Sequence, residues 1–261
     1  MNEFIEVNGC MLEMNHRVVD VERPTLIFLH EGLGSIRQWR DFPEEVGRAT
    51  GCNTLVYNRA GYGSSDLAIV PRQVTYMHDE GLIVLPALID ALQIGKHILI
   101  GHSDGGSIAL IYGGGAASPN LLGIITEAAH VFNEDITVKS IEEAKEVYQT
   151  AELREKLAKN HPNVDHTFWG WNDIWLHPDF YHWNIEEYLP TIGVPVLVMQ
   201  GLDDQYGTLA QVDAIVSGIG TTTQTQPPVE KELIPDCMHT PHKEQHDHTL
   251  DAMTAFIHNI S

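Results

Sequence analysis

Six short apolar runs, separated by longer stretches with helical character, limit the folds open to this chain. The runs are TLIFLH at 25–30, NTLVYN at 53–58, HILIGH at 97–102, LLGIITEA at 121–128, PVLVMQG at 195–201 and the weaker KELIP at 231–235. Runs of this kind, alternating with helices, are typical of a parallel sheet with helices on both faces. Two further segments with alternating polar and apolar residues meet at Asn8-Gly9, a pair that favours the tight turn of a β-hairpin. The pattern therefore predicts an α/β fold with a mostly parallel, doubly wound sheet of eight strands.

One long segment interrupts this alternation. Between about 131 and 190 the sequence shows no strand signal. Ser140 opens a Ser-Ile-Glu-Glu capping box, and a helical pattern continues to about Asn160. Residues 167–190 follow with eight aromatic side chains, including four of the five tryptophans. We therefore expect a core formed by residues 1–130 and 191–261, with a helical cap inserted at 131–190.

The negative net charge of the chain limits the kinds of molecule that it is expected to bind. The chain has 36 Asp and Glu residues against 15 Lys and Arg residues, a formal net charge of −21. A surface of this sign repels nucleic acid and anionic membranes, so neither is an expected partner. No secretory signal is visible at the N-terminus, and the three cysteines are widely spaced, which favours reduced thiols. We expect a cytoplasmic monomer or homodimer that acts on a small molecule.

The segment GHSDG at 101–105 lies between an apolar run and the start of a helix. In that position a G-x-S-x-G pattern describes a sharp strand-to-helix turn, with the serine at its apex in a strained backbone conformation. The N–H groups at the start of the following helix favour developing negative charge. The pattern therefore predicts that Ser103 is a catalytic nucleophile.

Together with four further motifs, this turn resembles the α/β-hydrolase family over essentially the whole chain. LHEGLGS at 29–35 resembles the family's oxyanion loop, and YNRAGYGSSD at 57–66 its glycine-rich turn. QGLDDQYG at 200–207 is similar to the loop that carries the acid, and PDCMHTPHKEQ at 235–245 to the loop that carries the histidine. The acid and the histidine follow the serine in the order expected for this fold.

The resemblance implies a Ser-His-Asp triad. A serine hydroxyl needs a base within about 3 Å and a carboxylate that orients the base. His239 matches the family's histidine. The family's spacing selects Asp204 as the acid over its neighbour Asp203, and Glu127 is a more distant alternative because some relatives carry the acid there. As an ordinary residue, Glu127 would be a capped, solvated strand end.

The resemblance also implies an oxyanion hole formed by the backbone N–H of Asp104 and that of Gly32 or Leu33. Glu31 stands where the family usually has glycine. Its carboxylate must point away from the oxyanion or pair, and Arg59 and Arg37 are the partners considered. Glu31 could instead be a structural ligand of the loop.

The residues expected to form the substrate pocket are Glu31, His102, Trp169, Trp171 and Trp175. The three tryptophans could line an apolar pocket above the serine, or they could attach the cap to the core through their large buried area. The sequence leaves both roles open.

The implied activity is hydrolysis of a carboxylic ester through an acyl-enzyme, with no cofactor and no metal. The closing histidines, at 242, 246, 248 and 258, complete no recognisable zinc pattern, and HEGLG at 30–34 lacks the second histidine of H-E-x-x-H. Hydrolysis of a C–C bond, a lactone or a thioester would use the same triad. The alternative from another class is a non-catalytic ligand-binding protein with the same fold.

Overall fold

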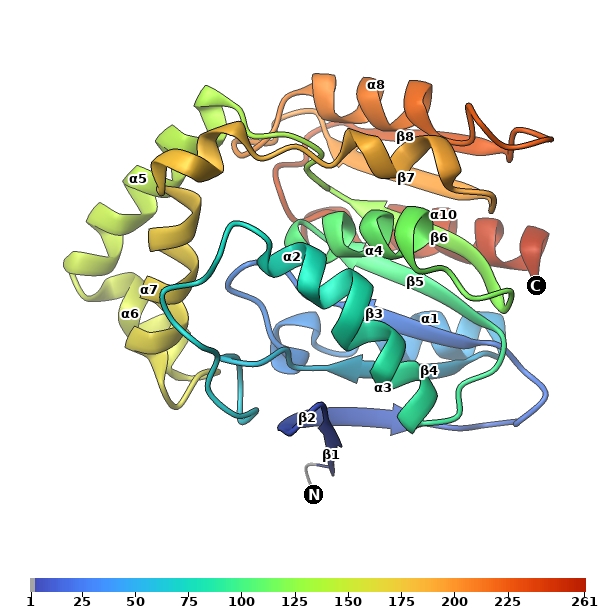
Figure 1. Cartoon of the computed structure of the whole chain (residues 1–261), viewed down its shortest axis with the longest axis horizontal. Helices are drawn as coiled ribbons and strands as arrows, with labels where there is room; N and C mark the ends of the chain where they lie inside the picture. The colour runs from blue at the N-terminus through green and yellow to red at the C-terminus, as the bar shows by residue number, and fades with distance from the viewer. Residues whose placement is uncertain (1–2) are drawn as a thin grey trace.

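The computed structural model describes residues 3–261 and contains one eight-stranded sheet (Figure 1). Strand β2 runs antiparallel to both of its neighbours, β1 and β4. All other pairs of neighbouring strands run parallel. The strands are β1 Glu3–Val7, β2 Cys10–Arg17, β3 Thr25–Leu29, β4 Asn53–Tyr57, β5 His97–His102, β6 Leu121–Glu127, β7 Val196–Gly201 and β8 Val229–Ile234. The hairpin predicted at Asn8-Gly9 is confirmed, and both turn residues have positive φ.

The spatial order of the strands is β1-β2-β4-β3-β5-β6-β7-β8. After β3 the chain forms β4 on one side of it, then crosses to form β5 on its other side, and continues outward to β8. The carboxyl ends of the parallel strands meet at one edge of the sheet, which is where open α/β sheets bind ligands. This architecture confirms the predicted fold class.

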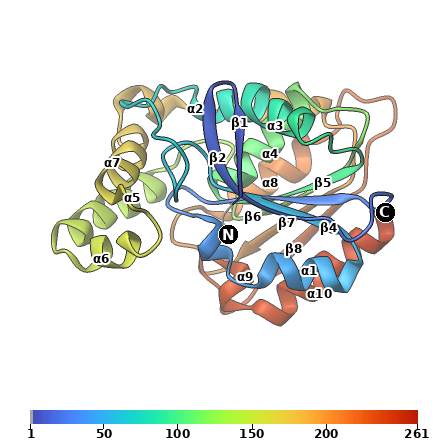
Figure 2. The ribbon, with the colours of Figure 1, turned by 90° about the horizontal axis from the view of Figure 1, so that it is seen from below.

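Helices cover both faces of the sheet, and successive strand residues point to opposite faces. Figure 2 shows α1 and α10 on one side of the sheet and α3, α4 and α8 on the other. Phe28 packs in a core with Phe256 of α10, and Ile27 packs in a second core with Ile108 of α4. The helical elements of the core are α1 Phe42–Thr50, α2 Tyr76–Asp79, α3 Leu85–Ala91, α4 Asp104–Gly115, α8 Leu209–Gly218, α9 Pro241–Glu244, α10 His246–Ile260 and the turns η1 Ile36–Trp39 and η2 Glu80–Val84.

A helical insertion separates β6 from β7, and Figure 1 shows its helices α5, α6 and α7 at one end of the sheet. Its elements are α5 Asp135–Gln149, α6 Glu152–Ala158, α7 Val164–Trp175, η3 Pro178–His182 and η4 Glu186–Thr191. The predicted capping box at Ser140 is wrong, because α5 begins five residues earlier. The Ser140 hydroxyl instead donates a hydrogen bond of 2.6 Å to the backbone oxygen of Gln205, outside the insertion.

Throughout residues 3–261, no helix combines the length and the apolar character that crossing a membrane requires.

Candidate active site

Ser103 lies at the turn between β5 and α4 in a conformation that few non-glycine residues adopt. Its φ is 53° and its ψ is −118°. Such strain persists only where the surroundings hold it, and it is concentrated at functional sites. Ser103 N–H donates to the backbone oxygen of Glu127 at 2.8 Å, and Gly106 N–H donates to the oxygen of Ser103 at 2.8 Å. The predicted strained turn is therefore present, and its serine lies at the carboxyl edge of the sheet.

The glycines of the motif permit the close approach of α4 to the strands. A Cβ on Gly101 would collide with the backbone of Gly105, and a Cβ on Gly105 would collide with the backbone of Leu29. Side chains at these two positions would push the helix away from β3 and β5. The G-x-S-x-G spacing thus follows from backbone packing.

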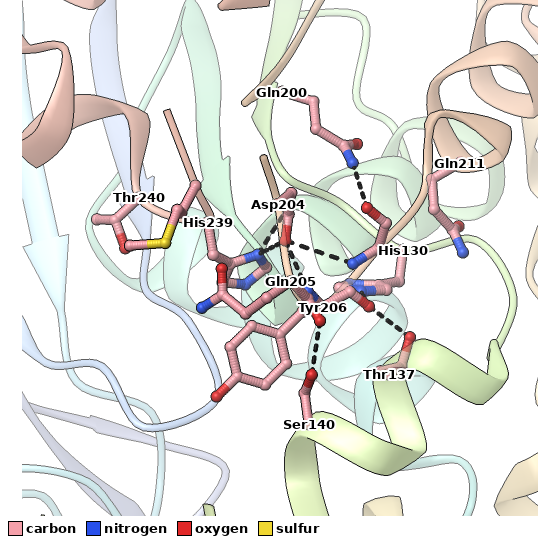
Figure 3. A network of polar contacts seen from close by, with 12 residues as sticks. His130, Thr137, Ser140, Gln200, Asp204, Gln205, Tyr206, Gln211, His239 and Thr240 are labelled. Atoms are coloured by element: carbon pink, nitrogen blue, oxygen red, sulfur yellow. Dashed lines mark hydrogen bonds and ion pairs between the residues drawn. The ribbon is translucent and has the colours of Figure 1, made fainter. Parts of the chain in front are cut away.

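His239 and Asp204 are hydrogen-bonded to one another (Figure 3). His239 Nδ1 lies 2.9 Å from Oδ1 and 3.0 Å from Oδ2 of Asp204. Asp204 Oδ1 also accepts a hydrogen bond from the N–H of Tyr206 at 2.8 Å. The neighbouring Asp203 is exposed, whereas Asp204 is buried. The structure therefore places Asp204, and not Asp203, against the histidine.

This contact fixes the proton positions on the imidazole. A carboxylate only accepts, so Nδ1 of His239 donates and Nε2 carries the free lone pair of the neutral ring. Burial alone would lower the pKa of His239, but the Asp204 carboxylate raises it above its usual value. Burial alone would raise the pKa of Asp204, but the facing imidazole lowers it. The pair is thus arranged to stabilise an imidazolium.

Ser103 and His239 both line one cavity of about 70 Å³. Its lining residues are Glu31, Gly32, Leu33, Ser103, Asp104, His130, Thr137, Ile141, Trp171, Trp175, Tyr206 and His239. Segments that are distant from one another in the sequence contribute to it. The cavity therefore collects the predicted nucleophile, the base and all three residues considered for the oxyanion hole.

Two of the three predicted pocket tryptophans line this cavity, and the third does not. Trp171 and Trp175 are four residues apart on α7 and thus share one side of the helix. Trp169 is two residues from Trp171, so it faces elsewhere. Its ring lies edge-on to the Phe168 ring, with centroids 5.1 Å apart. The pocket role predicted for Trp169 is wrong, because its position on the helix directs it to the packing within the insertion.

Trp171 covers the loop after β3. A Cβ on Gly32 would collide with the indole nitrogen of Trp171. Only a residue without a side chain leaves room for this ring. The insertion is thereby packed directly on the expected oxyanion loop.

His102 lies next to Ser103 but outside the cavity lining. Its ring is buried, and Nε2 donates a hydrogen bond of 2.7 Å to the backbone oxygen of His239. The predicted pocket role of His102 is therefore wrong. The ring instead supports the backbone of the loop that carries His239.

The Glu31 side chain has neither of the arginine partners considered. Its Oε1 lies 3.9 Å from Nζ of Lys243, and its Oε2 lies 3.9 Å from Nδ1 of His102. Arg59 binds the backbone oxygen of Glu31 at 2.9 Å, and Arg37 binds the backbone oxygen of Lys159. Glu31 nevertheless lines the cavity, as predicted.

Glu127 is hydrogen-bonded to His242 and not to His239. Nδ1 of His242 donates to Oε2 of Glu127 at 2.7 Å, and both side chains are buried. The solvated strand end considered for Glu127 is therefore wrong. His239 pairs with Asp204, whereas Glu127 is hydrogen-bonded to a different histidine, His242.

The fold and these contacts agree with the sequence profile of the alpha/beta hydrolase family, which matches residues 26–252. This chain belongs to that family.

Two groups of curated relatives match over shorter stretches. The 2-succinyl-6-hydroxy-2,4-cyclohexadiene-1-carboxylate synthase of Salmonella paratyphi C is 29% identical over 120 residues, which are 46% of this chain and 44% of the synthase. The proline iminopeptidase of Lactobacillus helveticus is 31% identical over 91 residues, which are 35% of this chain and 31% of the peptidase. Each match spans less than half the length of the relative.

Solved structures match the whole chain. A meta-cleavage product hydrolase from Pseudomonas fluorescens has a TM-score of 0.78 at 15% identity. The match covers 99% of this chain and 98% of the chain of that hydrolase. An enol-lactonase from Burkholderia xenovorans has a TM-score of 0.75 at 16% identity, covering 98% and 99%. At this identity the likeness concerns the fold alone.

One charged pair of this α/β hydrolase was not predicted from the sequence. The Asp104 carboxylate accepts a hydrogen bond of 2.7 Å from the hydroxyl of Tyr76 and lies 3.6 Å from Nη1 of Arg59. All three side chains are buried. The contact between Asp104 and Arg59 fixes the first residue of α4 to the glycine-rich turn after β4. Its partners are far apart along the chain, so it leaves no local sequence pattern.

Four lining residues were also missed: His130, Thr137, Ile141 and Tyr206. The first follows β6, and a residue after the carboxyl end of a parallel strand is a general candidate for the site. Thr137 and Ile141 lie on α5, four residues apart, which puts them on the same side of the helix. Tyr206 follows Asp204 by two residues.

Among residues 3–261, no group of three or more His, Cys, Asp or Glu side chains is placed to hold a metal ion.

Proposed function

We propose that this α/β hydrolase is a serine hydrolase that cleaves carboxylic esters through an acyl-enzyme. One observation carries the proposal. Ser103, in its strained turn, lines the same cavity as His239, whose Nδ1 is held by Asp204. Nucleophile, base and orienting acid then follow the logic of the serine triad.

In this mechanism Ser103 Oγ attacks the ester carbonyl carbon while its proton passes to Nε2 of His239. The tetrahedral intermediate collapses when Nε2 returns that proton to the leaving alcohol, and the acyl group stays on Ser103. A water molecule, deprotonated by the same Nε2, then attacks the acyl-enzyme, and Nε2 returns this proton to Ser103 Oγ as the acid is released. Asp204 stabilises the imidazolium formed in each half-reaction and is not itself protonated.

Backbone N–H groups of Asp104 and Gly32 stabilise the oxyanion in this proposal. Asp104 is the first residue of α4, so its N–H has no partner within the helix. The carbonyl oxygen of Glu31 accepts hydrogen bonds from His30 and Arg59. Because the peptide bond is trans, the N–H of Gly32 points away from these donors. Gly32 and Leu33 both line the cavity, and we favour Gly32 because its N–H points away from the donors that bind the Glu31 oxygen.

Labelling with a fluorophosphonate probe tests the proposal. We expect covalent modification of Ser103, identified by peptide mapping, because this reagent reacts with activated serines. Ser64 is exposed, and a Ser64→Ala variant serves as a control that must still be labelled. Labelling at another residue, or none, contradicts the mechanism.

Hydrolysis of a C–C bond, a lactone or a thioester is the second candidate activity. The names of the solved neighbours, a meta-cleavage product hydrolase and an enol-lactonase, make these substrate classes worth including in the panel. The same three residues would serve each reaction. Ligand-induced thermal shifts without turnover across the whole panel would favour a non-catalytic binding protein.

The pH dependence of kcat/KM is expected to show a rising limb with its midpoint above 6.5. Only neutral His239 can accept the proton of Ser103. Burial opposes the imidazolium, but Asp204, with smaller contributions from Glu31 and Asp104, raises the pKa of His239 above 6.5. Activity is therefore lost as the pH falls through this raised value. A pH-stat assay with an alkyl ester measures the limb, and a midpoint well below 6.5 would assign the base to another group.

A further inference from the structure

Arg59 is a buried cation that contacts both segments of the proposed oxyanion hole. It follows the end of β4 by two residues, and its exposed fraction is 1%. A charged side chain removed from water is unfavourable unless its donors find partners in the interior. The contacts of Arg59 therefore indicate what this chain uses the buried charge for.

One set of contacts reaches the loop after β3. Nη2 of Arg59 donates to the backbone oxygen of Glu31 at 2.9 Å and to that of His30 at 3.3 Å. The Glu31 oxygen also accepts a hydrogen bond from Nδ1 of His30 at 2.7 Å, and Nε2 of His30 accepts one from the backbone N–H of Arg59 at 3.1 Å. Burial, together with the charge of Arg59, lowers the pKa of His30 well below its usual value, so the ring stays neutral and can both donate and accept.

These donors act on the peptide group that joins Glu31 to Gly32. Its oxygen is held by two donors, one of which is charged, and its N–H is the proposed oxyanion donor of Gly32. Because the peptide group is planar and trans, fixing the oxygen also fixes the direction of the N–H. Hydrogen bonds in series polarise one another in the protein interior, so this N–H becomes a stronger donor.

Another contact of Arg59 reaches the start of α4. Nη1 lies 3.6 Å from Oδ2 of Asp104, a separation typical of an ion pair without a hydrogen bond. The same Oδ2 accepts a hydrogen bond from the Tyr76 hydroxyl at 2.7 Å. The backbone N–H of Asp104 is the other proposed oxyanion donor. The positive charge of Arg59 also offsets the repulsion that this carboxylate would exert on an oxyanion formed nearby.

We infer that Arg59 is a positioning residue that holds both N–H donors of the oxyanion hole, that of Gly32 through the Glu31 carbonyl and that of Asp104 through its carboxylate. The inference rests on the proposed function, since an oxyanion must form beside Ser103. A planar guanidinium can serve the two sides at once, whereas a lysine ammonium is a single compact charge. Arg59 is not one of the residues that line the cavity, so it acts through the backbone of its partners.

A tetrahedral adduct tests this inference in the wild-type protein. The probe is trifluoroacetone: Ser103 Oγ adds to its carbonyl carbon, the hydroxyl proton passes to Nε2 of His239, and the carbonyl oxygen becomes an oxyanion. We expect the amide protons of Gly32 and Asp104 to shift downfield in the NMR spectrum, because they donate to that oxygen. A shift at Leu33 in place of Gly32 overturns the inference, since the peptide group held by Arg59 would not supply the donor.

Arg59→Lys retains the positive charge but loses the planar fork. We expect kcat for p-nitrophenyl acetate to fall by roughly 10- to 100-fold while KM stays within about threefold, because oxyanion donors act mainly in the transition state. The inhibition constant of trifluoroacetone should rise by a similar factor. Rates are expressed per serine titrated to completion with a fluorophosphonate, so a misfolded fraction does not contribute.

Arg72, in the same connection between β4 and α2, offers the matched control. Its guanidinium carbon lies 5.1 Å from the centroid of the Tyr62 ring, and that of Arg59 lies 4.9 Å from the same centroid. Throughout residues 3–261, no hydrogen bond or ion pair links Arg72 to Asp104 or to the loop after β3. Arg72→Lys should therefore keep kcat and the inhibition constant within about threefold of wild type.

Two results with the variants also overturn the inference. One is an unchanged kcat in folded Arg59→Lys, and the other is an equal loss in Arg72→Lys, which would mean general damage to this connection. If Arg59→Lys does not fold, the wild-type NMR spectrum still decides. Failure of the proposed function is distinguishable, because Ser103 would then react neither with the fluorophosphonate nor with trifluoroacetone.

Discussion

Replacing Ser103 with alanine is expected to lower kcat/KM for a carboxylic ester by at least about 10³-fold. The variant retains the oxyanion donors and the His239–Asp204 pair, but it has no hydroxyl to form the acyl-enzyme. Residual activity would come from water attack on an ester held in the cavity. The measurement is initial-rate hydrolysis of a short p-nitrophenyl ester at several substrate concentrations.

Thermal melts of both proteins check that Ser103→Ala is folded. Alanine at this position retains the strained φ of 53°, so no large gain in stability from relief of strain is expected. If the variant hydrolyses the ester at more than a tenth of the wild-type rate, Ser103 is not the nucleophile.

Asp204→Asn is expected to lower kcat/KM by about 10³- to 10⁴-fold. An asparagine side chain can present its NH₂ group to Nδ1 of His239, which favours the tautomer with the proton on Nε2. That tautomer cannot accept the proton of Ser103. The loss of the carboxylate also removes the main group that raises the pKa of His239, so the rising limb of the pH profile moves to lower pH.

The adjacent carboxylate offers a matched control. Asp203 is exposed and is not the residue hydrogen-bonded to the histidine, so Asp203→Asn should keep kcat/KM within about threefold of wild type. Equal losses in the two variants would mean that charge in this loop, and not the hydrogen bond to His239, determines activity. A large loss in Asp203→Asn alone would transfer the role to Asp203.

The sheet and the strained turn could be predicted because their signals are local. Apolar runs of strand length, alternating with helices, indicate buried parallel strands. The glycines flanking Ser103 reflect the close packing of α4 on the neighbouring strands, which requires glycine at fixed distances from the serine. The pairing of Asp204 with His239 followed from chain order and family spacing, although the two residues are 35 positions apart.

The rest of the site depends on contacts that have no pattern along the chain. Trp169 and Trp171 look equivalent in the sequence, and only the start and rotation of α7 direct Trp171 toward the cavity and Trp169 away from it. The ring of His130 is hydrogen-bonded to the Tyr206 carbonyl, 76 positions away. Asp104 pairs with Arg59 from another strand end. Such long-range pairs are properties of the folded packing.

The hydroxyls of Thr137 and Ser140, on successive turns of α5, donate to the backbone oxygens of Tyr206 and Gln205. These two carbonyls belong to the residues that directly follow Asp204. An outward swing of α5 would therefore have to break both hydrogen bonds or carry the Asp204 loop with it. Because Asp204 holds Nδ1 of His239, the position of α5 is thereby linked to the orientation of the proposed base.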